Sequence, residues 1–110
     1  MTTVTAPASA EDIRASRALD AFTRLDGTDR RRPQAREAAI EAWLPMANRL
    51  ARRFSGRGAA DEDLRQVAAV GLIKAIDRYD PAAGDFVAFA LPTVLGELRR
   101  YFRDRTWSVR

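Results

Sequence analysis

The residue types best suited to a binding chemistry are the aromatic rings and arginines near the carboxyl end of the chain. Residues 79–110 hold six of the nine aromatic residues of this 110-residue chain, interleaved with five arginines. Aromatic rings stack on the faces of unpaired bases, and guanidinium groups hold phosphates. The segment therefore favours binding to single-stranded nucleic acid, with the alternative that its rings pack in a core.

The residues that are missing exclude several other chemistries. The chain has no histidine and no cysteine, which removes the usual general base, the usual metal ligand, disulfides and thiol chemistry. The acids Asp61, Glu62 and Asp63 are explained as the first turn of a helix. No apolar run approaches the roughly 20 residues that span a bilayer, and the amino terminus does not resemble a secretory signal. We expect a cytoplasmic protein that is not an enzyme, with no metal, cofactor or membrane partner.

Charge is distributed in blocks along the chain. Residues 30–57 carry a net charge of +6 and residues 97–110 carry +3, whereas residues 61–85 carry −3. Two basic blocks around an acidic one indicate two kinds of partner, one of them polyanionic. Eighteen arginines against one lysine are equally typical of an arginine-rich genome, so the placement of these residues must decide.

The elements that position these residues are predicted to be helices, because alanine is abundant and β-branched alternation is nearly absent. The sequence predicts an all-α fold, a compact bundle of about four helices. Residues 1–8 are predicted to be disordered. Ser9 and Asp12 predict a capping box that begins an N-terminal helix within residues 9–27, and Asp26-Gly27 is predicted to end it.

A second helix is predicted over about residues 29–54. Pro33 is compatible with its first turn, where the missing N–H is harmless. Pro45 is expected to kink or split the helix. The predicted buried face comprises Ile40, Trp43, Leu44, Ala47, Leu50, Ala51 and Phe54.

The third helix is predicted over residues 61–78, with Asp61 as its N-cap and Asp80-Pro81 closing it. Its packing side comprises Leu64, Val67, Ala68, Gly71, Leu72, Ala75 and Ile76. Gln66, Ala69, Ile73 and Lys74 fall on or near the opposite flank. An exposed Ile73 there is a candidate contact for a protein partner.

The last helix is predicted from the N-cap Asp85 to about Arg103. Helical periodicity predicts one core-facing stripe: Val87, Leu91, Val94, Leu98 and Phe102. The opposite face comprises Phe89, Thr93, Gly96, Arg100 and Arg103, with Phe86 at its margin. Two rings and two arginines on one face suit nucleic acid, but Phe86 and Phe89 packing beneath the second helix stays open. Tyr101 and Trp107 are equally ambiguous.

Several motifs resemble region two of bacterial RNA polymerase sigma factors. They are ARRFSGRG, DEDLRQVAAVGLIKAIDRYDP and FVAFALPTVLGELRRYFRDRTWSVR, in this order at the family's spacing. The sequence of these motifs is similar to that of the alternative sigma factors for general stress and sporulation, especially the actinobacterial members. The resemblance covers roughly residues 28–110 and implies a sigma factor region-two domain, which binds core RNA polymerase and the promoter −10 element.

The resemblance implies that the third helix docks on the coiled coil of the β′ clamp of core RNA polymerase. By alignment, the polymerase-binding positions are Asp63, Leu64, Gln66, Val67, Ala69 and Ile73. Family members are commonly held by an anti-sigma factor, which is therefore an expected partner.

The resemblance also implies that the last helix captures non-template-strand bases as promoter DNA melts. Tyr79, Phe86 and Phe89 match positions that line the base pocket. Lys74 and Arg100 match positions near the DNA backbone, and Gly96 and Arg99 match positions that read the upstream edge of the element. Together with the exposed face of the helix, the expected DNA-binding residues are Lys74, Tyr79, Phe86, Phe89, Thr93, Gly96, Arg99, Arg100 and Arg103.

The chain departs from primary sigma factors at Pro92-Thr93, where they carry a tryptophan pair that supports strand separation, and at Val87-Ala88-Phe89, where they carry a hydroxyl-bearing Ser-Thr-Tyr run able to hydrogen-bond the base. Weaker spontaneous melting and an altered −10 preference are therefore expected. The chain ends where the family continues into its next domain, and we expect it to be a fragment. The run Arg30-Arg31-Arg32 is compatible with contact to downstream DNA or with a solvated surface. The alternative function is a helical protein-interaction module, a decoy for an anti-sigma factor or the clamp without DNA melting activity.

Overall fold

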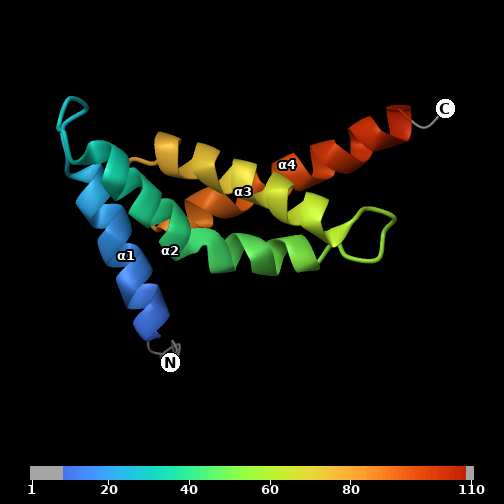
Figure 1. The fold of residues 1–110 in the computed structure, drawn as a ribbon, viewed down its shortest axis with the longest axis horizontal. Coiled ribbons are helices and arrows are strands. Elements are labelled where there is room, and N and C mark those ends of the chain that lie inside the picture. Colours follow the sequence, from blue (N-terminus) through green and yellow to red (C-terminus); the bar gives the residue numbers. More distant parts are fainter. Residues whose placement is uncertain (1–8, 109–110) are drawn as a thin grey trace, which may run out of the picture. The chain divides into compact units, whose positions relative to one another are not determined.

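The computed structural model describes residues 9–108, and the side chains of residues 9–105. Its elements are α1 (Ala10–Thr23), α2 (Arg32–Arg52), α3 (Asp61–Arg78), the short 3-10 helix η1 (Pro81–Ala83) and α4 (Phe86–Ser108) (Figure 1). The predicted all-α fold of about four helices is confirmed for this part of the chain. The predicted disorder of residues 1–8 lies outside the described residues. No helix among residues 9–108 is both long and apolar enough to cross a membrane.

The chain divides into two compact units, Met1–Ala42 and Trp43–Arg110, and the division falls inside α2. The first unit holds α1 and the beginning of α2. The second unit holds the rest of α2 with α3, η1 and α4. The predicted beginning of a region-two domain near residue 28 stays a prediction.

Helix α1 begins as predicted and ends earlier than predicted. Ser9 Oγ accepts a hydrogen bond from the Asp12 N–H at 3.0 Å, and the Asp12 carboxylate accepts one from the Ser9 N–H at 3.2 Å. The prediction that Asp26-Gly27 ends the helix in a left-handed turn is wrong. The helix ends at Thr23, because the Leu25 N–H already turns back to the Phe22 carbonyl at 3.2 Å, three residues before it.

Helix α2 runs without interruption from Arg32 to Arg52. Pro33 lies in its first turn, as predicted. Of the kink or split predicted at Pro45, the split does not occur, since the helix continues through this residue, and the kink stays a prediction. The buried side chains of α2 and the turn after it are Ala39, Trp43, Met46, Ala47, Leu50, Ala51 and Phe54. Gly56 and Gly58, with φ of 82° and 91°, provide the left-handed turns that lead toward α3.

Helix α3 has the predicted bounds but a different first turn. Asp61 is its first residue rather than its cap: the N-cap is Ala60, which makes no side-chain hydrogen bond. The Asp61 carboxylate instead accepts from the Ser55 hydroxyl at 2.7 Å, so it fastens the preceding loop. The helix ends at Arg78 because Tyr79 and Asp80 are extended before Pro81, as predicted.

Helix α4 begins after its predicted N-cap and continues beyond its predicted end near Arg103. The Asp85 carboxylate accepts a hydrogen bond from the Ala88 N–H at 3.0 Å, which is the expected capping contact. Pro92 lies within the continuous helix.

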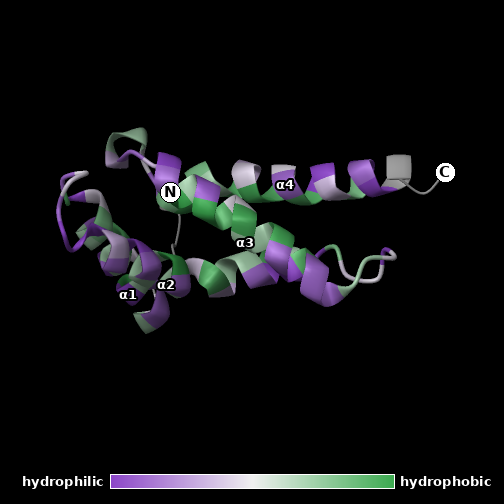
Figure 2. Ribbon diagram, turned by 45° about the horizontal axis from the view of Figure 1, so that its top comes forward, coloured by the Kyte–Doolittle hydropathy of each residue, from purple (hydrophilic) through white to green (hydrophobic). Residues whose placement is uncertain are grey.

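The buried stripe of α4 differs from the predicted one. The buried residues are Phe86, Ala90, Val94 and Leu98, whereas the predicted Val87, Leu91 and Phe102 are only half-buried. Helix α4 packs against α3, with Val94 at the contact, and Figure 2 shows hydrophobic residues along the side of α4 that is turned toward α3. Periodicity alone favoured the larger Val87 and Leu91 over Ala90.

The backbones of α3 and α4 come close together at Gly71. A Cβ atom placed on Gly71 would lie 2.8 Å from the Cα of Val94 and 3.3 Å from the Cγ of Glu97. Gly71 is therefore the residue that lets the two helix backbones meet.

Candidate nucleic-acid and protein interface

Four aromatic rings gather where α2, the end of α3 and the start of α4 meet. The Phe86 ring centroid lies 4.8 Å from that of Trp43 and 5.1 Å from that of Tyr79. The Phe89 ring lies 5.5 Å from the ring of Tyr79. The structure thus brings the three expected pocket residues together and adds Trp43, which the sequence indicated only as a core residue.

The rings of this cluster differ in their access to solvent. Phe86 is 5% exposed and packs on Trp43, so the alternative that it lies beneath the second helix is correct for this residue. Tyr79 and Phe89 are half-buried. The cluster therefore has a buried floor, Phe86, and two partly accessible rings able to stack on a planar group.

The segment between Tyr79 and α4 holds the accessible rings in place. Asp80 caps η1 by accepting a hydrogen bond from the Ala82 N–H at 2.9 Å. Gly84 has a φ of 103°, and its carbonyl accepts a hydrogen bond from the Tyr79 hydroxyl. The hydroxyl of Tyr79 thus closes the turn, and this hydrogen bond fixes the orientation of the Tyr79 ring.

The outer face of α4 carries the predicted cationic residues. Gly96, Arg99, Arg100 and Arg103 are exposed, and Thr93 is half-buried. Arg103 lies 4.0 Å from the Asp104 carboxylate at the surface. Guanidinium groups at such positions are available to phosphates. The side chain of Trp107 lies outside the described residues.

Lys74, the remaining expected DNA contact, already has a partner within the protein. Its ammonium group forms an ion pair with the Glu97 carboxylate of α4. The sequence did not single out Glu97, because the two residues are 23 positions apart and only the α3–α4 packing brings them together.

A second surface lies on α3, beside α4. A hollow of about 430 Å³ is lined by Asp63, Gln66, Val67, Val70 and Tyr101. Three of these five are expected polymerase-binding residues. Val70 is 46% exposed and was missed by the sequence reasoning, which had proposed the half-buried Ile73 as the exposed apolar residue. Val70 lies one helical turn after Val67, which the resemblance had placed among the polymerase-binding positions.

The other expected polymerase-binding residues are placed differently. Leu64 is 1% exposed and lies in the core, so it does not reach this surface. Ala69 and Ile73 are half-buried on α3.

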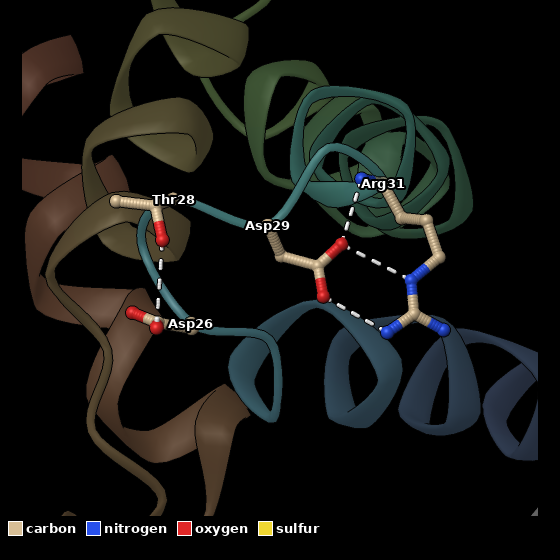
Figure 3. Close-up of polar contacts among 4 residues, drawn as sticks. All are labelled: Asp26, Thr28, Asp29 and Arg31. Carbon is tan, nitrogen blue, oxygen red and sulfur yellow. Dashed lines mark hydrogen bonds and ion pairs between the residues drawn. The ribbon is translucent and has the colours of Figure 1, made fainter.

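The first unit holds the basic run at the start of α2. Arg31 donates three hydrogen bonds to the Asp29 carboxylate, two from its guanidinium at 3.1 and 2.9 Å and one from its backbone N–H at 2.8 Å (Figure 3). These hydrogen bonds lower the pKa of Asp29 to about 2. Arg30 is exposed, whereas Arg32 is half-buried with its guanidinium 4.4 Å from the Phe22 ring centroid. The run is therefore divided between structural contacts and solvent.

Among residues 9–108, no group of three or more acidic, histidine or cysteine side chains is arranged to hold a metal ion. The site consists of rings, guanidinium groups and apolar surface, so its chemistry is stacking, ion pairing and apolar contact.

Comparison with known proteins identifies a matching family and several similar proteins. Residues 39–108 match the family described as Sigma-70 region 2. The chain is 53% identical over 76 residues to RNA polymerase sigma factor SigF of Mycobacterium tuberculosis, covering 68% of this chain and 29% of the relative. It is 49% identical over 81 residues to RNA polymerase sigma-F factor of Kitasatospora aureofaciens, covering 73% and 27%. It is 47% identical over 77 residues to RNA polymerase sigma-B factor of Bacillus subtilis, covering 69% and 29%.

These alignments span less than a third of the length of each relative. The comparison with solved structures found no match.

Proposed function

We propose, from the premise that this chain belongs to the sigma-70 region 2 family, that it is the promoter-binding domain of an alternative sigma factor. In this role it docks on core RNA polymerase, recognises the −10 element and captures bases of the non-template strand during melting. It acts in the cytoplasm by binding polymerase and promoter DNA and not as an enzyme. The genes whose transcription it initiates are stress or developmental genes. An anti-sigma factor is a further expected partner.

The observation that carries the proposal is the pair of partly accessible rings, Tyr79 and Phe89, above the buried floor of Phe86. An extruded base needs a stacking surface, and the strand that carries it needs cations. The exposed arginines of α4 lie on the same helix as Phe89 and supply those cations. The cluster and the arginines therefore suit one single-stranded ligand.

The decisive experiment measures binding of a fluorescent non-template-strand −10 oligonucleotide. Phe89→Ala should weaken binding by about 1–3 kcal/mol if one base stacks on the ring. Affinity should also fall steeply as salt rises, because phosphate binding releases counterions. Tyr101→Ala is the matched control, since it removes a half-buried ring from the other side of the same helix. Equal losses for the two variants, or affinity that ignores salt, would contradict the proposal.

The docking half of the proposal concerns the hollow on α3. Val70 is an exposed aliphatic residue within it, so Val70→Glu should abolish capture of core RNA polymerase without unfolding the chain. Ile13→Glu is the control, because Ile13 is an aliphatic residue of similar exposure on α1. Undiminished capture by Val70→Glu would exclude this surface.

We propose that this chain melts promoter DNA weakly by itself, because Pro92-Thr93 stands where primary sigma factors carry a tryptophan pair. Permanganate footprinting of a promoter with core enzyme should show less opening than with a housekeeping sigma factor. Equal opening at matched occupancy would refute this part.

A second candidate, a decoy that binds protein but not DNA, is favoured by the burial of Phe86. The oligonucleotide assay separates the two, because a decoy captures polymerase or an anti-sigma factor and ignores the −10 strand.

A further inference from the structure

The Lys74–Glu97 ion pair joins α3 to α4 beside the proposed nucleic-acid surface. The Lys74 side chain is 36% exposed and the Glu97 side chain only 13% exposed. The pair is therefore partly withdrawn from solvent, and salt screens such a pair less than it screens a fully exposed one. Glu97 also borders a hollow with Arg100, an expected DNA-backbone contact.

The shape of the helix contact fixes the Glu97 side chain in this position. Its Cγ lies 3.3 Å from the point that a Cβ of Gly71 would occupy. The stem of Glu97 thus passes over the bare backbone of Gly71 and reaches Lys74, one turn further along α3.

We propose that Glu97 masks Lys74 and limits the affinity of this surface for the nucleic-acid backbone. A phosphate that approaches Lys74 must displace the carboxylate, which then stays half-buried without its cation and next to a second negative charge. Lys74 is the only lysine of the chain, and the pair neutralises it in the free protein. This inference rests on the proposed DNA-binding function, and it makes Glu97 a residue that acts through Lys74.

The test measures binding of the non-template −10 oligonucleotide to the 110-residue chain over a range of salt concentrations. Glu97→Gln keeps the shape of the side chain and removes its charge. It should raise affinity for the oligonucleotide about 3–10-fold at low salt. The slope of log K against log salt concentration should become steeper by about 0.7, the value for one more phosphate contact on a single strand. Lys74→Gln should lose more affinity in the Glu97→Gln background than in the unsubstituted chain, because only there is the lysine unmasked.

Glu62→Gln is the matched control, since it removes the carboxylate that pairs with Arg65 on α3, and Arg65 is not an expected DNA contact. A gain from Glu97→Gln that exceeds the gain from Glu62→Gln and disappears with Lys74→Gln supports masking. An equal gain from both variants, or no gain from Glu97→Gln, overturns it. If Phe89→Ala weakens binding while Glu97→Gln leaves it unchanged, only the masking inference fails. If Phe89→Ala has no effect, the proposed function itself fails.

Discussion

The approach of α3 to α4 at Gly71 gives the sharpest stability prediction. In Gly71→Ala the new methyl carbon would lie 2.8 Å from the Val94 Cα, a contact that real Cβ atoms do not show. The opposing atom belongs to the backbone of a helix, so the helices must separate rather than a side chain rotate. The 3.3 Å contact with the Glu97 Cγ involves a flexible stem, which yields more easily.

The magnitude follows from two opposed effects. Overpacking a well-packed core costs about 1–3 kcal/mol, and a backbone clash belongs at the upper end of that range. Replacing glycine by alanine inside a helix contributes about 1 kcal/mol in the opposite direction. The expected net destabilisation of Gly71→Ala is therefore about 2 kcal/mol.

Gly96→Ala provides the matched control. Gly96 also lies inside a helix, is exposed, and has no atom within 4 Å of the position of an added Cβ. This variant should gain about 0.5–1 kcal/mol from the reduced freedom of the unfolded chain. Because the helix-propensity effect is common to both variants, their difference isolates the clash.

The assay is urea and thermal unfolding followed by circular dichroism at 222 nm. A loss of 1 kcal/mol lowers the melting temperature of a domain of about 100 residues by about 4–8 °C. We expect Gly71→Ala to melt below the unsubstituted chain and Gly96→Ala to melt above it. Equal stability of the two variants would refute the close approach of α3 and α4.

Three further predictions concern single contacts. In an NMR titration the Asp29 carboxyl should have a pKa of about 2, and Arg31→Gln should return this pKa toward 3.8. Because folding lowers the pKa, the Asp29–Arg31 contact stabilises the folded chain fully above pH 3.8, and this contribution is lost as the pH falls through about 2. Asp85→Ala should destabilise the chain by about 1 kcal/mol through loss of the α4 N-cap, and a urea midpoint equal to that of the unsubstituted chain would contradict the capping role. Leu98→Ala should destabilise it by about 2–5 kcal/mol because the side chain is fully buried, and a smaller loss in the same unfolding assay would show that the core collapses around the cavity.

The local signals of this sequence were enough to predict most helix termini and the residue types of the site. The caps at Ser9 and Asp85 depend on hydrogen bonds to residues three positions away, and the end of α3 depends on the geometry of the Asp80-Pro81 peptide unit. Because these contacts are local, the sequence alone predicts them. The same reasoning failed at Asp61, whose carboxylate found the hydroxyl of Ser55 instead of its own helix. The aromatic cluster was predicted from motif order, but the burial of Phe86 on Trp43 was left open.

The sequence by itself determined that the chain is helical, that Ser9 and Asp85 cap two of its helices, and that several of its rings and arginines share the last helix. Only the tertiary structure decided which face of that helix is buried, that Val70 is exposed and Leu64 is not, and that Glu97 reaches Lys74. The physical reason is that burial depends on the shape of the partner. Sequence periodicity predicts burial from hydrophobicity and spacing, whereas Gly71 is buried because its lack of a side chain lets the backbones of α3 and α4 approach.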